Sequence, residues 1–122
     1  MRRILAVDDN EDILEIMKLI LEDFGYEVTT LADGTLIFDA INSAHPDLIL
    51  LDVMLGNADG RELCKQIKLR QETHDIPVIL VSASHQIADR LSMNNGAPDD
   101  FLAKPFDIND LLEKVESHMA AA

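Results

Sequence analysis

Five polar side chains directly follow short apolar runs in this 122-residue sequence. Three are carboxylates, one is a hydroxyl and one is an ammonium group: Asp8, Asp9, Asp52, Ser82 and Lys104. Clustered carboxylates cannot all ionise comfortably unless a cation neutralises them, and hard oxygen ligands at small spacing favour magnesium. A buried carboxylate without a partner costs several kcal/mol, so Asp52, directly after the apolar residues 48–51, requires an explanation. The pattern predicts a magnesium site that a hydroxyl and a lysine also face.

The elements that precede these residues must position them. Short apolar runs rich in β-branched residues alternate with longer amphipathic segments, which is typical of parallel βαβ units. The second run alternates and suits an edge strand, whereas the first, third and fourth are almost entirely apolar, as in strands buried on both faces. The sequence predicts an α/β fold with a doubly wound, five-stranded parallel sheet and helices on both faces. The expected strands are residues 4–7, 27–30, 48–51, 78–81 and 101–103, and the expected helices are residues 12–24, 35–42, 61–70, 86–93 and 108–119.

In an open sheet of this kind, ligands bind beyond the carboxyl ends of the strands, where the strand order reverses. For the flavodoxin-like order 2-1-3-4-5 this point lies between the first and third strands, so Asp8, Asp9 and Asp52 would converge on one crevice. Residues 8–12 also fit simple helix-start chemistry, because Asp caps helices and acids in a first turn complement the helix dipole. The sequence alone leaves both interpretations of residues 8–12 open.

The first expected helix carries an apolar stripe at helical spacing. Such a stripe can bind a partner, but packing against the sheet is the usual outcome, so we interpret it as core. Cys64, the single cysteine, has apolar neighbours and is expected to be a buried, unreactive thiol. The members of the stripe are Ile13, Ile16, Met17, Ile20, Leu21 and Phe24.

Composition limits the functional classes. A formal net charge of -13 opposes binding to nucleic acid and to anionic lipid, both of which attract basic surfaces. No apolar run approaches the ~20 residues of a membrane-spanning helix, and Asp8 and Asp9 interrupt the first run too early for a secretion signal. A lone cysteine cannot form an internal disulfide, which favours a reducing compartment. We expect one cytoplasmic domain over residues 1–122, with residues 119–122 as a frayed tail and no membrane insertion.

Beyond these patterns, the chain resembles a response-regulator receiver domain of the chemotaxis-receiver type over essentially its whole length. The resemblance rests on short motifs that each follow the appropriate strand, together with an Asp-Gly pair that starts the third helix. Each motif is weak by itself, but the ordered set is strongly specific. The motifs are Asp8-Asp9, Asp52, Ser82-Ala83, Lys104-Pro105-Phe106 and Asp59-Gly60.

The resemblance implies that Asp52 accepts a phosphoryl group from a histidine kinase or a histidine phosphotransfer protein in a two-component phosphorelay. It also implies that magnesium is bound by Asp52, directly by Asp9, mainly through water by Asp8, and by the backbone carbonyl of Met54. Such a receiver is not a turnover enzyme on an external substrate, although it assists its own phosphorylation and dephosphorylation.

The same resemblance implies roles for three further residues. Lys104 and Ser82 would bind phosphoryl oxygens, and phosphorylation would move Ser82 toward the phosphoryl group while Phe101 turns inward. This switch would alter the face formed by the fourth helix, the fifth strand and the fifth helix, through which a downstream effector protein or domain is controlled.

The sequence departs from the usual pattern of the family at several positions. Glycine stands at position 56, where proline is common, and loosens the loop after the acceptor. Residues 96–100 are one residue longer than the usual run before the fifth strand, so the fourth helix is expected to be shorter or shifted. Met54 and Ser84 occupy positions that influence hydrolysis of the acyl phosphate, and neither carries an acid or an amide. Rapid hydrolysis is therefore not expected.

Other functions fit parts of the pattern. A flavodoxin-like cofactor binder shares the fold class, but its first strand leads into a hydroxyl-rich phosphate loop rather than Asp8-Asp9. A haloacid-dehalogenase-type phosphatase has a second aspartate two residues after its nucleophile, where this chain has Met54. The strongest rival is a receiver-like module that binds proteins without being phosphorylated. Competent residues at all five expected site positions favour the phosphoacceptor.

Overall fold

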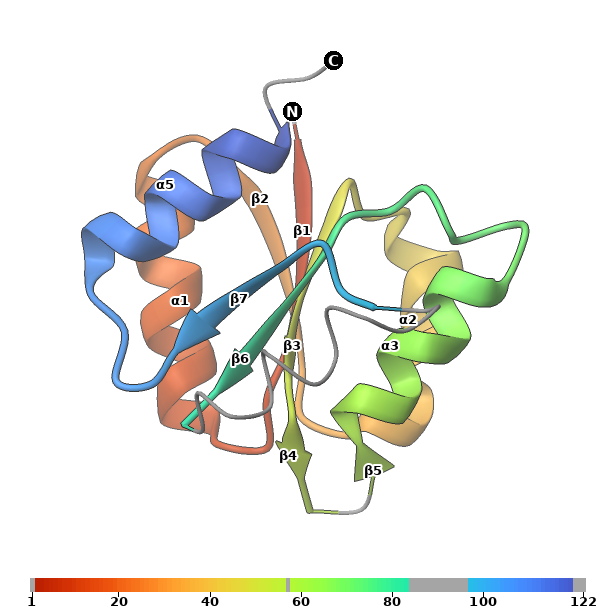
Figure 1. The fold of residues 1–122 in the computed structure, drawn as a ribbon. Helices are drawn as coiled ribbons and strands as arrows, with labels where there is room; N and C mark the ends of the chain where they lie inside the picture. The colour runs from red at the N-terminus through yellow and green to blue at the C-terminus, as the bar shows by residue number, and fades with distance from the viewer. Residues whose placement is uncertain (1, 57, 84–96, 120–122) are drawn as a thin grey trace.

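The central sheet has five parallel strands in the order β2-β1-β3-β6-β7 (Figure 1). The computed structural model describes residues 2–56, 58–83 and 97–119. Counted along the chain within this sheet, the strand order is 2-1-3-4-5, so the predicted fold class is confirmed. The strands are β1 (Arg3–Val7), β2 (Glu27–Leu31), β3 (Leu48–Asp52), β6 (Val78–Ser82) and β7 (Asp100–Ala103).

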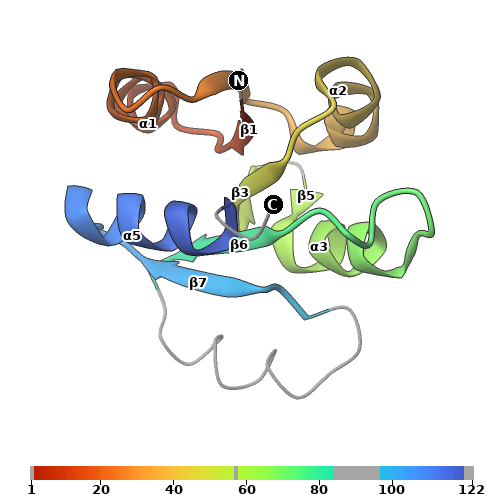
Figure 2. The same cartoon turned by 90° about the horizontal axis from the view of Figure 1, so that it is seen from above.

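Helices cover both faces of the sheet, as Figure 2 shows. On one face lie α1 (Glu11–Asp23) and α5 (Ile108–Met119), and on the other lie α2 (Ile37–Ala44) and α3 (Gly60–Leu69). A 3-10 turn, η1 (Gly34–Leu36), precedes α2. Among the residues that the structure describes, no helix is long and apolar enough to cross a membrane. The helix predicted at residues 86–93 lies outside the described residues.

The burial of the strands follows their place in the sheet. Every residue of β3 and β6 is buried, as expected for strands with neighbours on both sides and helices on both faces. In β2 only Val28 is buried, which confirms the predicted edge position. The parallel register aligns Val7 with Leu51 and Ser82 with Ala103, so the carboxyl ends of these strands meet at one edge of the sheet.

The apolar stripe of α1 is only partly core. Leu14, Met17 and Leu21 are buried and face the sheet, whereas Ile16 is 50% exposed and Phe24 is 56% exposed. The interpretation of the whole stripe as core was therefore wrong for Ile16 and Phe24. Successive residues turn by about 100° around a helix, so a face centred on Leu14, Met17 and Leu21 leaves Ile16 on its flank. Phe24 caps the C-terminus of α1, beyond the last helical residue.

A short hairpin not predicted from the sequence connects β3 to α3. Its strands are β4 (Met54–Leu55) and β5 (Ala58–Asp59), which pair antiparallel. Leu55 is buried within the apolar cluster on the α2 and α3 side of the sheet. The predicted frayed tail cannot include Met119, because this residue ends α5 and is 5% exposed within the other apolar cluster. Residues 120–122 of that tail lie outside the described residues.

Candidate functional site

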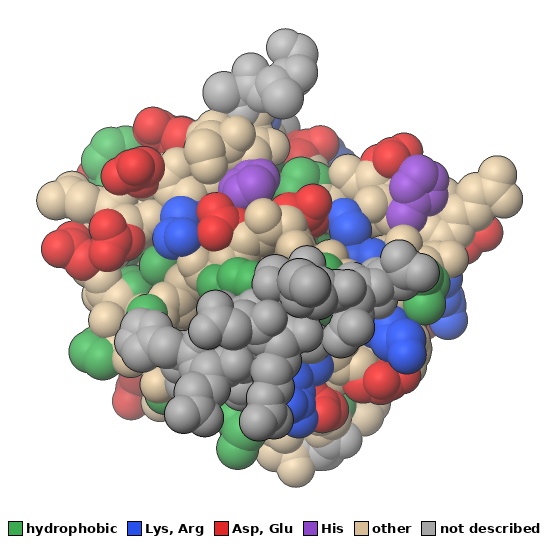
Figure 3. Space-filling model, in the orientation of Figure 1, with side chains coloured by type: hydrophobic (Ala, Val, Ile, Leu, Met, Phe, Trp, Pro, Cys, Tyr) green, Lys and Arg blue, Asp and Glu red, His purple; other side chains and the backbone are tan. Residues whose placement is uncertain are grey.

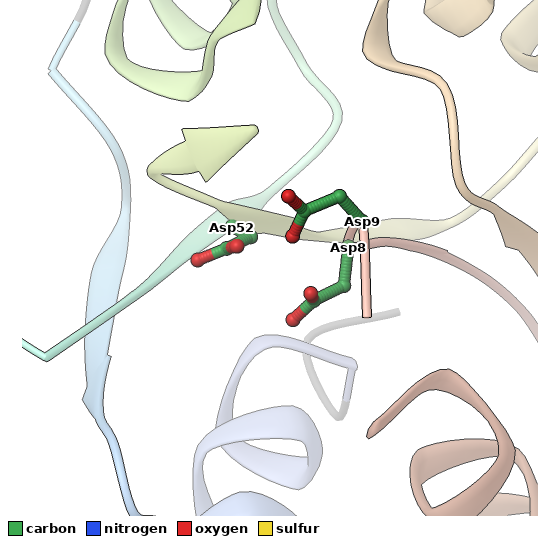
Figure 4. A group of neighbouring side chains, drawn as sticks. All are labelled: Asp8, Asp9 and Asp52. Atoms are coloured by element: carbon green, nitrogen blue, oxygen red, sulfur yellow. The ribbon is translucent and has the colours of Figure 1, made fainter. Parts of the chain in front are cut away.

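Three carboxylates converge at the carboxyl edge of the sheet. Asp8 and Asp9 follow β1, and their side chains extend toward Asp52, the last residue of β3 (Figure 4). One ligand atom from each residue lies within 4.8 Å of the others. Asp8 and Asp52 are 1% and 5% exposed, while Asp9 is open to solvent. The predicted convergence of these residues is confirmed, and the set consists entirely of hard oxygen ligands.

Lys104 joins two of these carboxylates. It follows β7, and its Nζ atom lies 2.9 Å from Oδ2 of Asp8 and 3.3 Å from Oδ1 of Asp52. The backbone amide of Lys104 donates to the carbonyl of Ser82 at 2.9 Å, and a cis peptide bond joins Lys104 to Pro105. Its side chain points into the acidic site, where it contacts Asp8 and Asp52.

The electrostatics of the site reflect this crowding. Burial raises the pKa of the Asp52 carboxyl, and the neighbouring Asp8 carboxylate raises it further; Lys104 and the backbone amide of Met54 oppose these effects without cancelling them. Burial lowers the pKa of Lys104, but hydrogen bonds and charge from Asp8 and Asp52 outweigh burial and raise it overall. Among the residues that the structure describes, one ammonium group, that of Lys104, is paired with this cluster of three carboxylates, so these side chains together carry an excess of negative charge.

At the start of α1, one residue caps the helix and a different residue belongs to the acidic site. The side chain of Asn10 accepts hydrogen bonds from the amides of Asp12 and Ile13 and is the N-cap. Asp8 instead accepts from the amide of Asn10 at 2.9 Å and from Lys104. Helix-start chemistry therefore explains residues 10–12, and it does not account for the inward position of Asp8.

The remaining predicted residues lie around this cluster. Ser82 ends β6 and is buried, with 8% of its surface exposed. Phe101 is half-buried in β7 and packs against the apolar cluster on the α2 and α3 side. Met54 begins β4, its amide donates to the Asp52 carboxylate, and its side chain is 75% exposed. Ser84 lies outside the described residues.

Two glycines touch the site in ways that sequence reasoning did not reveal. A Cβ atom at Gly60 would collide with the backbone of Asp52 and Val53, and one at Gly56 would lie 3.6 Å from Oδ2 of Asp9. The Asp-Gly pair at the start of α3 was visible as a motif. Only the packing of α3 against β3 reveals which atoms require the glycine.

An apolar groove of about 400 Å³ runs beside the site, between α1 and the segment that links β7 to α5. It includes the exposed flank of α1 and reaches Lys104, so an apolar surface adjoins the acidic one. Its lining residues are Ile13, Ile16, Ile20, Lys104, Pro105, Phe106 and Ile108.

Cys64 does not belong to the site. It is 1% exposed, and burial raises the pKa of its thiol to about 12. A thiol that stays protonated at neutral pH is a poor nucleophile, which agrees with the predicted role as a buried apolar residue.

The fold and site define a doubly wound domain with an acidic cluster and a lysine at its switch point. The family model described as "Response regulator receiver domain" matches residues 4–116. The chain therefore belongs to the response regulator receiver domain family, whose members are the phosphoacceptors of two-component signalling.

Curated proteins that are similar in sequence are named as regulators. The DNA-binding dual master transcriptional regulator RpaA of Synechocystis is 37% identical over 117 residues, covering 96% of this chain and 48% of RpaA. The nisin biosynthesis regulatory protein NisR of Lactococcus lactis is 39% identical over 117 residues, covering 96% of this chain and 50% of NisR. This chain thus spans about half the length of these curated relatives.

Solved structures confirm the fold. The receiver domain of a signal transduction histidine kinase from Syntrophus aciditrophicus superposes with a TM-score of 0.89 at 30% identity, covering 100% of this chain and 92% of that one. The Vibrio cholerae chemotaxis protein CheY4 superposes with a TM-score of 0.87 at 27% identity, covering 96% of this chain and 98% of CheY4.

Proposed function

We propose that Asp52 is the residue phosphorylated in this receiver domain. The observation that carries the proposal is the position of Lys104, whose Nζ atom contacts Asp8 and Asp52 at the edge of the three-carboxylate cluster. Asp52 supplies the attacking oxygen, and Lys104 lies where it can neutralise charge on the phosphoryl oxygens. Phosphoryl transfer depends mainly on such positioning and charge neutralisation.

Magnesium is the cofactor that the donor set fits. The cluster offers only oxygen ligands, retains negative charge beside one lysine, and includes the solvent-exposed carboxylate of Asp9. Asp9 and Asp52 would hold the ion directly, Asp8 mainly through water, and Met54 through its carbonyl. When bound, the ion neutralises charge on the phosphoryl group and on the carboxylates.

The reaction with a histidine donor is a balanced transfer. The bond between phosphorus and the imidazole nitrogen of the donor breaks, and a bond between phosphorus and a carboxylate oxygen of Asp52 forms. The product is an acyl phosphate, and the imidazole, which carries a proton on its other ring nitrogen during the transfer, leaves as the neutral base. Lys104 and Ser82 would bind phosphoryl oxygens.

The phosphodonor protein would cover the apolar groove beside α1. The groove reaches Lys104, which contacts Asp52, so a protein that brings its histidine to this site meets the groove at the same time. Ile16 and Ile108 are 50% and 51% exposed there. We assign this surface to a helical segment of a histidine kinase or phosphotransfer protein, whose own apolar face would bury these residues.

The output surface would include β7 and α5. Asp100 at the start of β7 lies 3.0 Å from Nζ of Lys114 and 3.0 Å from Nε2 of His118, both on α5. These contacts join β7 and α5, so a displacement of one element would also displace the other. Movement of Ser82 and Phe101 on phosphorylation would then alter this surface for a downstream effector protein or domain.

Several further properties follow from the same assignment. The protein would assist its own phosphorylation and dephosphorylation without turning over an external substrate. The acyl phosphate would be long-lived, because Met54 offers neither an acid nor an amide to activate water.

A reduced, buried Cys64 suits a cytoplasmic protein. RpaA is described as DNA-binding, but the net charge of -13 argues against direct nucleic-acid contact by this chain.

Intact-mass measurement tests the assignment. The wild-type protein, incubated with acetyl phosphate and Mg²⁺, should gain the mass of one phosphoryl group, and EDTA should prevent the gain. Asp52→Asn should abolish the gain, whereas Asp75→Asn, at a side chain that is 91% exposed, should leave it intact. Full phosphorylation of Asp52→Asn would show that Asp52 is not the phosphorylated residue. A wild-type protein that stays unmodified would favour the alternative, a receiver-like module that binds proteins without phosphorylation.

The lifetime of the product is measured in the same preparation. After removal of acetyl phosphate, the phosphorylated protein in Mg²⁺ should persist well beyond seconds. Loss of the phosphoryl mass within seconds would contradict the expected slow hydrolysis, while leaving the identity of the acceptor intact.

A further inference from the structure

The first residue of α3 lies directly against the backbone of Asp52. An ideal Cβ built on Gly60 would meet the carbonyl oxygen and carbon of Asp52 and the Cα of Val53, the last two at 2.9 Å. Real Cβ atoms essentially never approach other atoms closer than 3.0 Å. All three contacts are backbone atoms, which cannot rotate away as the end of a side chain can. A side chain at position 60 must therefore displace either α3 or the end of β3.

The glycine is required for this close approach and not for an unusual backbone angle. Among the described glycines only Gly25 has a positive φ, so Gly60 adopts angles that any residue can reach. Its amide donates to the carbonyl of Val53 at 2.9 Å, and the side chain of Asp59 accepts from the amide of Arg61 at 2.9 Å. The start of α3 is thus bound to the strand end on one side and capped on the other.

The same segment also reaches the opposite side of the site. Leu55 of the hairpin is buried, and the following Gly56 lies close to the carboxylate of Asp9. The turn of the hairpin therefore lies close to Asp9, after β1, and the residue that follows the hairpin lies against Asp52, on β3. A shift at the base of the hairpin would change the spacing between these carboxylates.

The distance between Lys104 and Asp52 leaves little tolerance for such a shift. Nζ of Lys104 already lies 3.3 Å from Oδ1 of Asp52, compared with 2.9 Å from Asp8. Charge-assisted hydrogen bonds between nitrogen and oxygen are typically about 2.7–2.9 Å long, so further displacement of Asp52 would break this contact.

We propose that Gly60 is a positioning residue for phosphoryl transfer, because its missing side chain lets α3 hold the backbone of Asp52 at the depth where its carboxylate meets Lys104 and the metal ligands. This inference rests on the proposed function of Asp52. It adds a requirement on α3, an element that contributes no side chain to the acidic cluster.

Gly60→Ala tests the proposal, with Gly25→Ala as the matched control. Gly25 has φ +95° and no atom within 4 Å of an added Cβ, so its substitution strains the backbone without touching the site. At saturating acetyl phosphate and Mg²⁺, Gly60→Ala should lower the phosphorylation rate about 100-fold, the scale expected for a reacting group misplaced by ~1 Å. Gly25→Ala should lower the melting temperature yet keep the wild-type rate.

The outcomes separate the two claims. If the wild type is not phosphorylated, the proposed function fails. If Gly60→Ala is phosphorylated at the wild-type rate, or if both alanine variants lose rate in proportion to their lost stability, only the positioning role is overturned.

A measurement on the wild type covers the case in which Gly60→Ala does not fold. Beryllofluoride with Mg²⁺ should slow hydrogen exchange at the Gly60 amide, which bonds to Val53, by more than at the core amide of Leu50. Equal slowing at Gly60 and Leu50 would reflect global stabilisation alone and would overturn the proposal.

Discussion

At the residue scale, the site is a compact set of opposed charges. Asp52 sits at the end of an apolar strand, beside a second buried carboxylate, and within the described part of the chain only Lys104 is paired with them. Burial and the charge of Asp8 therefore raise the pKa of Asp52. The folded protein is poised to gain free energy from any cation that enters the site, because the carboxylates are already assembled at a cost in self-repulsion.

The raised pKa of Asp52 predicts how the stability of the folded protein depends on pH in the absence of metal. A raised pKa means that the folded state holds the Asp52 proton more tightly than the unfolded state does. The associated stabilisation is complete below the ordinary value of 3.8 and is lost as pH rises through the folded pKa. Asp52→Asn should therefore gain stability relative to the wild type as pH rises from about 4 to about 7 in EDTA.

Chemical denaturation at several pH values measures this difference. Asp75→Asn, at an exposed carboxylate, should show no comparable trend. A wild type that becomes steadily more stable than Asp52→Asn as pH rises would contradict the raised pKa.

At the element scale, α1 has two functions on two sides. Leu14, Met17 and Leu21 bury one side against the sheet, while Ile16 on the flank remains half exposed beside the groove that reaches Lys104. An exposed apolar strip costs little in the monomer and provides area that a partner helix can bury. The helix therefore helps to place Asp8 and Asp9 and also offers a docking surface.

Substitution on this flank should separate protein donors from small-molecule donors. Ile16→Asp should leave phosphorylation by acetyl phosphate unchanged, because a small donor has no apolar helix to dock on this surface. Transfer from a histidine phosphotransfer protein that phosphorylates the wild type should fall about 30-fold, as for loss of an interface hot spot. Leu69→Asp, at an exposed position on α3, is the control and should retain transfer. Equal losses for the two variants would argue against docking on α1.

At the scale of the whole molecule, the net charge of -13 acts on every part of the fold. Acidic side chains gather over α5 on the face shown in Figure 3. The acidic residues Asp110, Glu113 and Glu116 of α5 are exposed. Like charges spread over a small domain repel one another and destabilise the compact state, and salt screens that repulsion. Ionic strength alone should therefore raise the melting temperature.

Magnesium should stabilise the protein beyond this general screening. Binding to the folded state alone adds about 2.7 kcal/mol when the free ion is at 100 times its Kd. The melting temperature in MgCl₂ should therefore be higher than the melting temperature in NaCl of equal ionic strength. Asp9→Asn should reduce this magnesium-specific increment while keeping the response to NaCl. Identical melting temperatures in the two salts would indicate screening without a specific site.

The fold class and four of the site residues could be predicted from the amino-acid sequence. Strands buried on both faces must be apolar throughout, and parallel strands deliver their carboxyl ends to one edge, so polar residues after those runs had to meet. Asp8, Asp9, Asp52 and Lys104 were predictable for this reason. The helix at residues 86–93 and the position of Ser84 stay predictions.

Features that depend on the packing of one element against another could not be predicted from the sequence. Which side of α1 faces the sheet, and hence the exposure of Ile16, follows from how the helix packs and not from the presence of an apolar stripe. The hairpin after Asp52 is too short to show a periodic pattern. The need for glycine at position 60 arises from a contact between α3 and the backbone at the end of β3. The residues next to Gly60 in the sequence do not show which atoms of another element lie against it.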